Sequence, residues 1–216
     1  MSPSPSERTS FLRVWMNALT KPNEQTFVKI ANLPNTKASV AYLWVFFTSL
    51  VQIFFLYLVQ GNLVRQALVQ QGYDIGVFGN GIEANLITLI CGTPIFAAAS
   101  VVFFAIVVAI IQWIARMFGG RGTFNQMAYV YAAIAAPFAL FRTVVALFAV
   151  IPYVGFCFGW IGVLAVLYFV ILQIIAVKAV NQIGWGQAVC AFTLPFIMLC
   201  CFFSVGLVAV IQLIVR

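Results

Sequence analysis

The chain has 216 residues, of which 64% are hydrophobic and 7% are charged, and its formal net charge is +7. Soluble globular domains carry about 25% charged residues, so this composition excludes an ordinary aqueous domain. There is no histidine, and no two of the five cysteines form a Cys-x-x-Cys pair. We therefore expect no metal site and no cofactor. The basic residues are too scattered for a nucleic-acid surface.

The N-terminal segment, residues 1–38, is the longest mainly polar part of the chain. Apolar residues recur at helical spacing on both sides of Pro22, and Asn23 can cap the second run. This pattern predicts two short amphipathic helices, which either lie in the membrane interface or pack against the end of a helical bundle. Trp15 and Phe27 are the candidate interface anchors.

Five apolar stretches make up the remaining domain, residues 39–216. A helix of about 20 apolar residues crosses the ~30 Å hydrocarbon core. Backbone groups find no water in lipid, and the apolar and polar alternation of barrel strands is absent, so the stretches are helices. The sequence predicts an all-α integral membrane protein, a bundle of five transmembrane helices preceded by short amphipathic interfacial helices. The predicted spans cover approximately residues 39–60, 85–115, 125–150, 156–177 and 188–215.

Three prolines fall inside predicted spans, namely Pro94, Pro137 and Pro195. Each removes a hydrogen bond to the preceding turn and predicts a helix kink. Kinks of this kind are either static, with neighbouring helices satisfying the freed groups, or part of a flexible transport core.

Gly155 and Gly159 form a small-residue pair at the start of the fourth span. Such a pair lets another helix approach closely. Packing within the bundle and dimerisation are the two interpretations.

The distribution of Lys and Arg predicts the orientation, because short cytoplasmic loops are enriched in these residues. The N-terminal segment holds five of them, the connection after the second span holds two, and Lys178 begins the fourth connection. The other side has only Arg65 and Arg216, offset by Asp74 and Glu83. We therefore expect a multi-pass protein with a cytoplasmic N-terminus and an external C-terminus.

Arg142 is the only charged residue inside a predicted span. Charges at membrane depth are costly and often functional. We predict an intramembrane charge pair between Arg142 and Glu83, both expected in the outer half of the bundle. The alternatives are an arginine that bends outward to the headgroups, and a water-filled transport cavity shared with Gln112 and Gln173.

The chain lacks the side-chain groups that enzymatic chemistry requires. The chain has four carboxylates, none within a predicted span, and no histidine to act as a base. A catalytic site needs convergent acid, base or nucleophilic groups, so we expect that the protein is not an enzyme.

Four segments of the chain carry a recognisable pattern. Residues 15–27 read WMNALTKPNEQTF, residues 119–137 read GGRGTFNQMAYVYAAIAAP, residues 151–155 read IPYVG, and residues 178–188 read KAVNQIGWGQA. These segments resemble the Yip family, the Ypt/Rab-interacting membrane proteins, which have many bacterial relatives.

The resemblance implies five spans and a cytoplasmic N-terminus. For eukaryotic members it implies recruitment of Rab-type GTPases and a part in membrane traffic. This chain has a short N-terminal region and lacks the Asp-Leu-Tyr-Gly-Pro block before the first span. It therefore looks like a prokaryotic-type member, expected in the cytoplasmic membrane of a prokaryote.

Together, these features predict a non-enzymatic membrane protein that organises or scaffolds other membrane components. It would act as an accessory subunit or as a membrane-shaping or trafficking-type factor. Its expected partners are the lipid bilayer and one or more membrane proteins, with a homo-oligomer left open. The alternative is a small transporter or channel that uses Arg142 and the proline-kinked helices.

Overall fold

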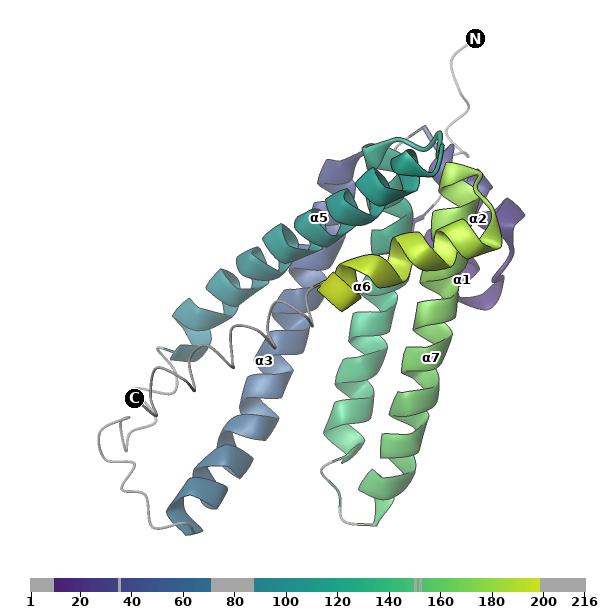
Figure 1. The fold of residues 1–216 in the computed structure, drawn as a ribbon. Coiled ribbons are helices and arrows are strands. Elements are labelled where there is room, and N and C mark those ends of the chain that lie inside the picture. The colour runs from purple at the N-terminus through teal and green to yellow at the C-terminus, as the bar shows by residue number, and fades with distance from the viewer. Residues whose placement is uncertain (1–9, 35, 71–87, 150, 152, 199–216) are drawn as a thin grey trace, which may run out of the picture.

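The computed structural model describes residues 10–34, 36–70, 88–149, 151 and 153–198, and the regular structure in these parts is entirely helical. In the described part of the chain, four long helices form the body of the molecule and converge at one end (Figure 1). The helices are α1 (Phe11–Thr20), α2 (Glu24–Ala31), α3 (Ala38–Gln70), the π-helix η3 (Thr88–Gly92), α5 (Thr93–Met117), α6 (Phe124–Ala149), α7 (Val154–Asn181) and a final helix, Trp185–Met198.

The short helices α1 and α2 lie at one end of the bundle, beside the turn between α5 and α6 (Figure 1). We call this the basic end, because Lys and Arg residues gather on the elements that meet there. They are Arg13, Lys21, Lys29, Lys37, Arg116, Arg121 and Lys178.

Helix α6 is the centre of the fold, since it contacts α1, α2, α3, α5 and α7. Small residues let neighbouring helices approach it closely. The buried residues of α6 include Ala128, Ala132, Ala133 and Ala136.

Within the described ranges, four helices are long and apolar enough to cross a membrane, and they coincide with the first four predicted spans. Helices α6 and α7 have 26 and 28 residues, or roughly 39 and 42 Å at 1.5 Å per residue. Both exceed the ~30 Å hydrocarbon core. The membrane-helical class predicted from hydropathy is therefore confirmed.

The fifth predicted span, 188–215, is described only in part. Its described portion belongs to the helix Trp185–Met198, which is described up to the last residue placed by the structure. In Figure 1 this helix runs obliquely across the bundle instead of along α7. Residues 199–216 lie outside the described part of the chain, so the count of five spans stays a prediction.

Helix α3 is longer than predicted. It continues to Gln70, ten residues beyond the expected end at residue 60. Residues 63–70 read LVRQALVQ, which are mostly good helix formers without a proline. A single glycine, Gly61, weakens a helix by only about 1 kcal/mol, so it does not end α3.

The second predicted span changes helix type near Pro94. The π-helix Thr88–Gly92 passes directly into α5, because Gly92 itself has right-handed helical angles, φ −70° and ψ −43°. Pro94 lies in the first turn of α5, so its ring and missing N–H coincide with the change from π-helix to α-helix. Pro137 lies inside α6, and Pro195 lies inside the final helix.

The two amphipathic helices form as predicted. The Asn23 side chain caps α2 by accepting a hydrogen bond from the Gln25 N–H, 3.2 Å away. Both helices pack against the bundle, and Phe27 is fully buried there. Phe27 thus contacts protein, whereas Trp15 is only partly buried.

One face of α1 stays uncovered. Phe11, Leu12 and Met16 are 52%, 56% and 59% exposed. Apolar side chains on this scale favour contact with lipid over water, so packing against the bundle and contact with the interface are compatible for α1.

Candidate functional site

A glycine-rich turn joins α5 to α6 at the basic end and packs against the end of α7. A Cβ atom on Gly122 would lie 2.8 Å from the Val180 carbonyl oxygen and 2.8 Å from Asn181 Oδ1. A Cβ on Gly120 would lie 2.7 Å from the Ala115 carbonyl oxygen. Gly119 has φ +86°, a region that favours glycine. The turn therefore requires glycine for close approach and for conformation.

Asn181 fastens this turn to α7. It is fully buried, and its Oδ1 accepts a hydrogen bond from Gln112 Nε2 at 2.9 Å. The same Gln112 nitrogen donates to the Gly122 carbonyl oxygen at 2.7 Å, and the Arg121 N–H donates to the Asn181 carbonyl oxygen at 3.1 Å. Hydrogen-bonded polar groups of this kind fix one arrangement of packed helices.

The start of α6 is held by a capping box. Thr123 accepts a hydrogen bond from the Gln126 N–H at 3.3 Å, and Gln126 Oε1 accepts from the Thr123 N–H at 3.0 Å. This reciprocal pair satisfies two free donors of the helix end. Gln126 Nε2 also donates to Asn32 Oδ1 at 3.3 Å, which connects α6 to the end of α2.

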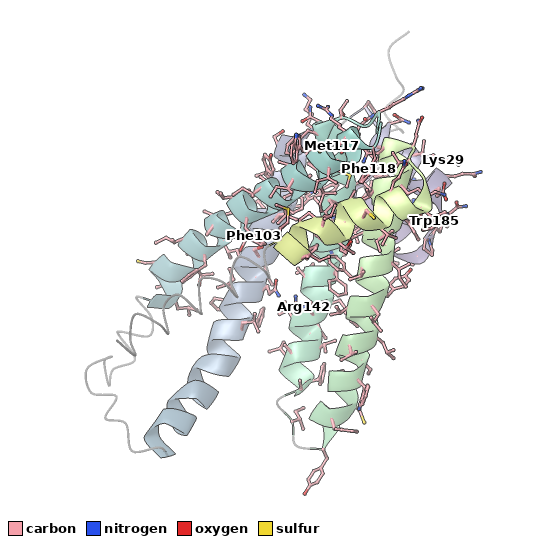
Figure 2. The ribbon with its side chains drawn as sticks, in the orientation of Figure 1. Lys29, Phe103, Met117, Phe118, Arg142 and Trp185 are labelled. Atoms are coloured by element: carbon pink, nitrogen blue, oxygen red, sulfur yellow. The ribbon has the colours of Figure 1, made fainter. Side chains whose placement is uncertain are left out.

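An ion pair connects α2 to α7. The Lys178 ammonium bonds to the Glu24 carboxylate and also lies 4.4 Å from the centre of the Trp185 ring. Figure 2 shows Trp185 and Lys29 at this same end of the molecule. The ion pair and the cation–π contact join the N-terminal segment, α7 and the final helix.

Aromatic side chains connect α1 to the bundle. The Trp15 and Trp44 rings are 5.7 Å apart, and Trp44 and Tyr129 are 4.9 Å apart. These distances lie in the favourable range for aromatic pairs. Tyr168 adds a polar contact, since its hydroxyl donates to the Leu19 carbonyl oxygen at 2.5 Å.

Arg142 lies far from the basic end, in a groove between α3, α6 and α7. Figure 2 shows it between the ribbons of α3 and α6. The groove is open on one side and has a volume of about 540 Å³. We call it the Arg142 groove, and its lining consists of Gln52, Leu56, Arg142, Val145, Ala146, Gly159, Gly162, Val163, Val166 and Leu167.

The Arg142 groove is mainly apolar. Among the described residues, Arg142 and Gln52 are the only polar side chains that line it, and glycine and alanine supply part of its wall. A Cβ on Gly159 would meet nothing within 4 Å. None of the described residues that line the groove is a carboxylate.

The structure places the two glycines of the predicted packing pair differently. A Cβ on Gly155 would lie 2.2 Å from the Ala149 carbonyl oxygen, so Gly155 serves the turn between α6 and α7. Gly159 instead faces the Arg142 groove. No helix of the described chain approaches Gly159 closely.

The predicted partner of Arg142, Glu83, lies outside the described residues. The polar residues expected for a transport cavity do not accompany Arg142. Gln112 is bonded at the basic end, and Gln173 is buried on α7. Neither lines the Arg142 groove.

Sequence reasoning missed the polar contacts of the basic end. Gln112 and Asn181 are 69 positions apart, and Glu24 and Lys178 are 154 positions apart. The Gly119-Gly120-Arg121-Gly122 run was the one available signal, because closely spaced glycines indicate close backbone approach.

The comparisons with known proteins agree with this picture. The Yip1 domain family matches residues 16–208, which include all four long helices and most of the N-terminal segment. No curated protein and no solved structure matches the chain significantly. Since the family match covers most of its length, the chain belongs to the Yip1 domain family.

Proposed function

We propose that this protein is a non-enzymatic scaffold that binds another membrane protein laterally, with a transmembrane helix of that partner seated in the Arg142 groove. The observation that carries the proposal is the groove itself. Its volume of about 540 Å³ and its small-residue wall at Ala146, Gly159 and Gly162 suit close approach of a helix backbone.

Arg142 and Gln52 define the chemistry of the partner helix. Both side chains donate hydrogen bonds, and in the proposed orientation Arg142 lies within a membrane-spanning helix, where a charge is costly without a partner. The proposed partner therefore presents a small residue to the glycines and a hydrogen-bond acceptor, best a carboxylate, to Arg142. An interhelical hydrogen bond in lipid contributes roughly 1 kcal/mol to the free energy of association. In this proposal, packing of the partner helix in the groove supplies the remainder of that free energy.

In this proposal the basic end faces the cytoplasm. Its seven basic residues are those that define the end, and such an excess is typical of the cytoplasmic side. The proposed location is the cytoplasmic membrane of a prokaryote, where the protein serves as an accessory subunit of a larger assembly or as a membrane-shaping factor.

A matched pair of substitutions tests the proposal. Ala146→Leu fills the Arg142 groove, whereas Ala98→Leu adds the same side chain to an exposed position of α5 outside it. After purification from native membranes, we expect Ala146→Leu to reduce recovery of the co-purifying membrane protein severalfold and Ala98→Leu to leave it unchanged. Equal recovery with both variants contradicts lateral binding in the groove.

A further inference from the structure

A second groove lies at the basic end, between α1 and α2. Its volume is about 290 Å³, at the lower limit for pockets of drug-sized ligands. We call it the α1–α2 groove, and its lining consists of Arg13, Val14, Asn17, Lys21, Thr26, Lys29, Ile30 and Leu33.

The basic side chains of this groove come from one face of each helix. Arg13, Asn17 and Lys21 follow one another at intervals of four, which places them in a row along α1 and its C-terminal end. Lys29 faces them from α2. None of the described residues that line the groove is a carboxylate. Glu24 of α2 does not line it and pairs with Lys178 instead.

The chemistry of the lining fits a phosphate group with hydroxyls beside it. An arginine fork and two lysines bind phosphate oxygens by charge-assisted hydrogen bonds. Asn17 and Thr26 supply neutral polar groups for hydroxyls. Val14, Ile30 and Leu33 give the groove an apolar side, which a free phosphate ion does not need.

The depth of α1 indicates that this ligand is part of a lipid. Tyr168 bonds to the Leu19 carbonyl oxygen, and Tyr168 lies ten residues before Lys178, about 15 Å along the helix. The C-terminal end of α1 thus lies beside the apolar part of α7. Interfacial helices occupy the boundary between headgroups and acyl chains, and the exposed Phe11, Leu12 and Met16 suit that depth.

We infer that the α1–α2 groove binds the headgroup of one anionic phospholipid, with Arg13, Lys21 and Lys29 on its phosphate and the apolar side toward its glycerol. This site is independent of the Arg142 groove. It holds the N-terminal segment to the leaflet that adjoins the basic end.

The test uses the full-length protein in mild detergent, titrated with phosphatidylglycerol and observed by native mass spectrometry. The triple variant R13Q/K21Q/K29Q removes the site. The control K37Q/R116Q/R121Q removes the same charge from the same end, but none of its residues lines the groove.

We expect one saturable lipid on the wild-type protein and binding weaker by on the order of a hundredfold in the site variant, since each basic residue near a surface contributes about 1 kcal/mol. The control should change binding less than about fivefold, because none of its residues lines the groove and exposed charges that make no direct contact are partly screened at physiological salt. Equal loss in both variants overturns the site. If the triple variant does not fold, the single variant K29Q must still weaken binding, and an unchanged affinity overturns the proposal.

Two competitors identify the source of the phosphate. Glycerol 1-phosphate in excess should not displace the lipid, because it lacks the apolar part. Displacement by glycerol 1-phosphate at the concentration of the lipid shows a soluble ligand and overturns the lipid assignment. Displacement by a polyglutamate peptide at the concentration of the lipid assigns the groove to an acidic protein segment and also overturns the lipid assignment.

Discussion

Replacing Gly122 with alanine should destabilise the protein, because the turn between α5 and α6 has no room for a Cβ. The added carbon would lie 2.8 Å from the Val180 carbonyl oxygen, 2.8 Å from Val180 Cγ1 and 2.8 Å from Asn181 Oδ1. The carbonyl cannot move without shifting the end of α7. Overpacking of this kind costs about 1–3 kcal/mol, and a shift of the turn also lengthens the 2.7 Å bond from Gln112 to the Gly122 carbonyl oxygen.

Gly186→Ala provides the matched control. Gly186 lies in the final helix and a Cβ there meets nothing within 4 Å. Alanine in that helix is neutral or stabilises it by up to about 1 kcal/mol.

The assay is thermal unfolding in detergent, followed by tryptophan fluorescence. For a chain of this size each kcal/mol corresponds to roughly 2–4 °C. We expect the Gly122→Ala variant to melt roughly 2 to 12 °C below the wild-type protein, and the Gly186→Ala variant at or slightly above it. If both variants melt at the wild-type temperature, the close approach of turn and α7 does not stabilise the fold and the reasoning is refuted.

The remaining predictions concern single residues. Tyr131→Phe should leave the melting temperature unchanged or raise it, because the buried Tyr131 hydroxyl has no hydrogen-bond partner among the described residues; a lower melting temperature would reveal a partner. In a cysteine-free background, an impermeant maleimide applied from outside should label the Tyr153→Cys variant and not the Arg121→Cys variant, and labelling of both from one side contradicts the proposed orientation. In the protein freed of its partner, a double-mutant cycle of Glu83→Gln and Arg142→Gln should give a coupling of about 1 kcal/mol, because Glu83 would pair with Arg142 until the partner's acceptor replaces it, whereas zero coupling excludes their predicted contact.

The helices themselves were predictable because their signals are local. Apolar length locates the four long helices, and Pro22 and Asn23 mark the boundary between α1 and α2. The predicted span stops at residue 60 whereas α3 continues to Gln70, since Gly61 carries too small a helix penalty to stop a run of good helix formers.

The two grooves depend on the relative orientation of the packed helices, that is, on their crossing angles and on which face each helix presents to its neighbours. Helical periodicity in the sequence contains no such information. The row of Arg13, Asn17 and Lys21 was visible in the sequence, but Lys29 joins it only because of the angle between α1 and α2. The wall of the Arg142 groove likewise combines residues of three helices. The spacing of Gly159 from Gly155 fits a helix-packing pair as well as it fits a groove wall, so the sequence alone predicted packing.

The central claim, lateral binding of a partner helix in the Arg142 groove, is tested most directly by site-specific photocrosslinking in native membranes. A photoreactive amino acid replaces Val163, which lines the groove and is 52% exposed, or Val102 on α5, which is 60% exposed and does not line it. We predict one dominant adduct with a membrane protein from position 163, through a transmembrane peptide that contains a carboxylate, and none from position 102. The same adducts from both positions, or lipid adducts alone at position 163, would contradict the proposed function.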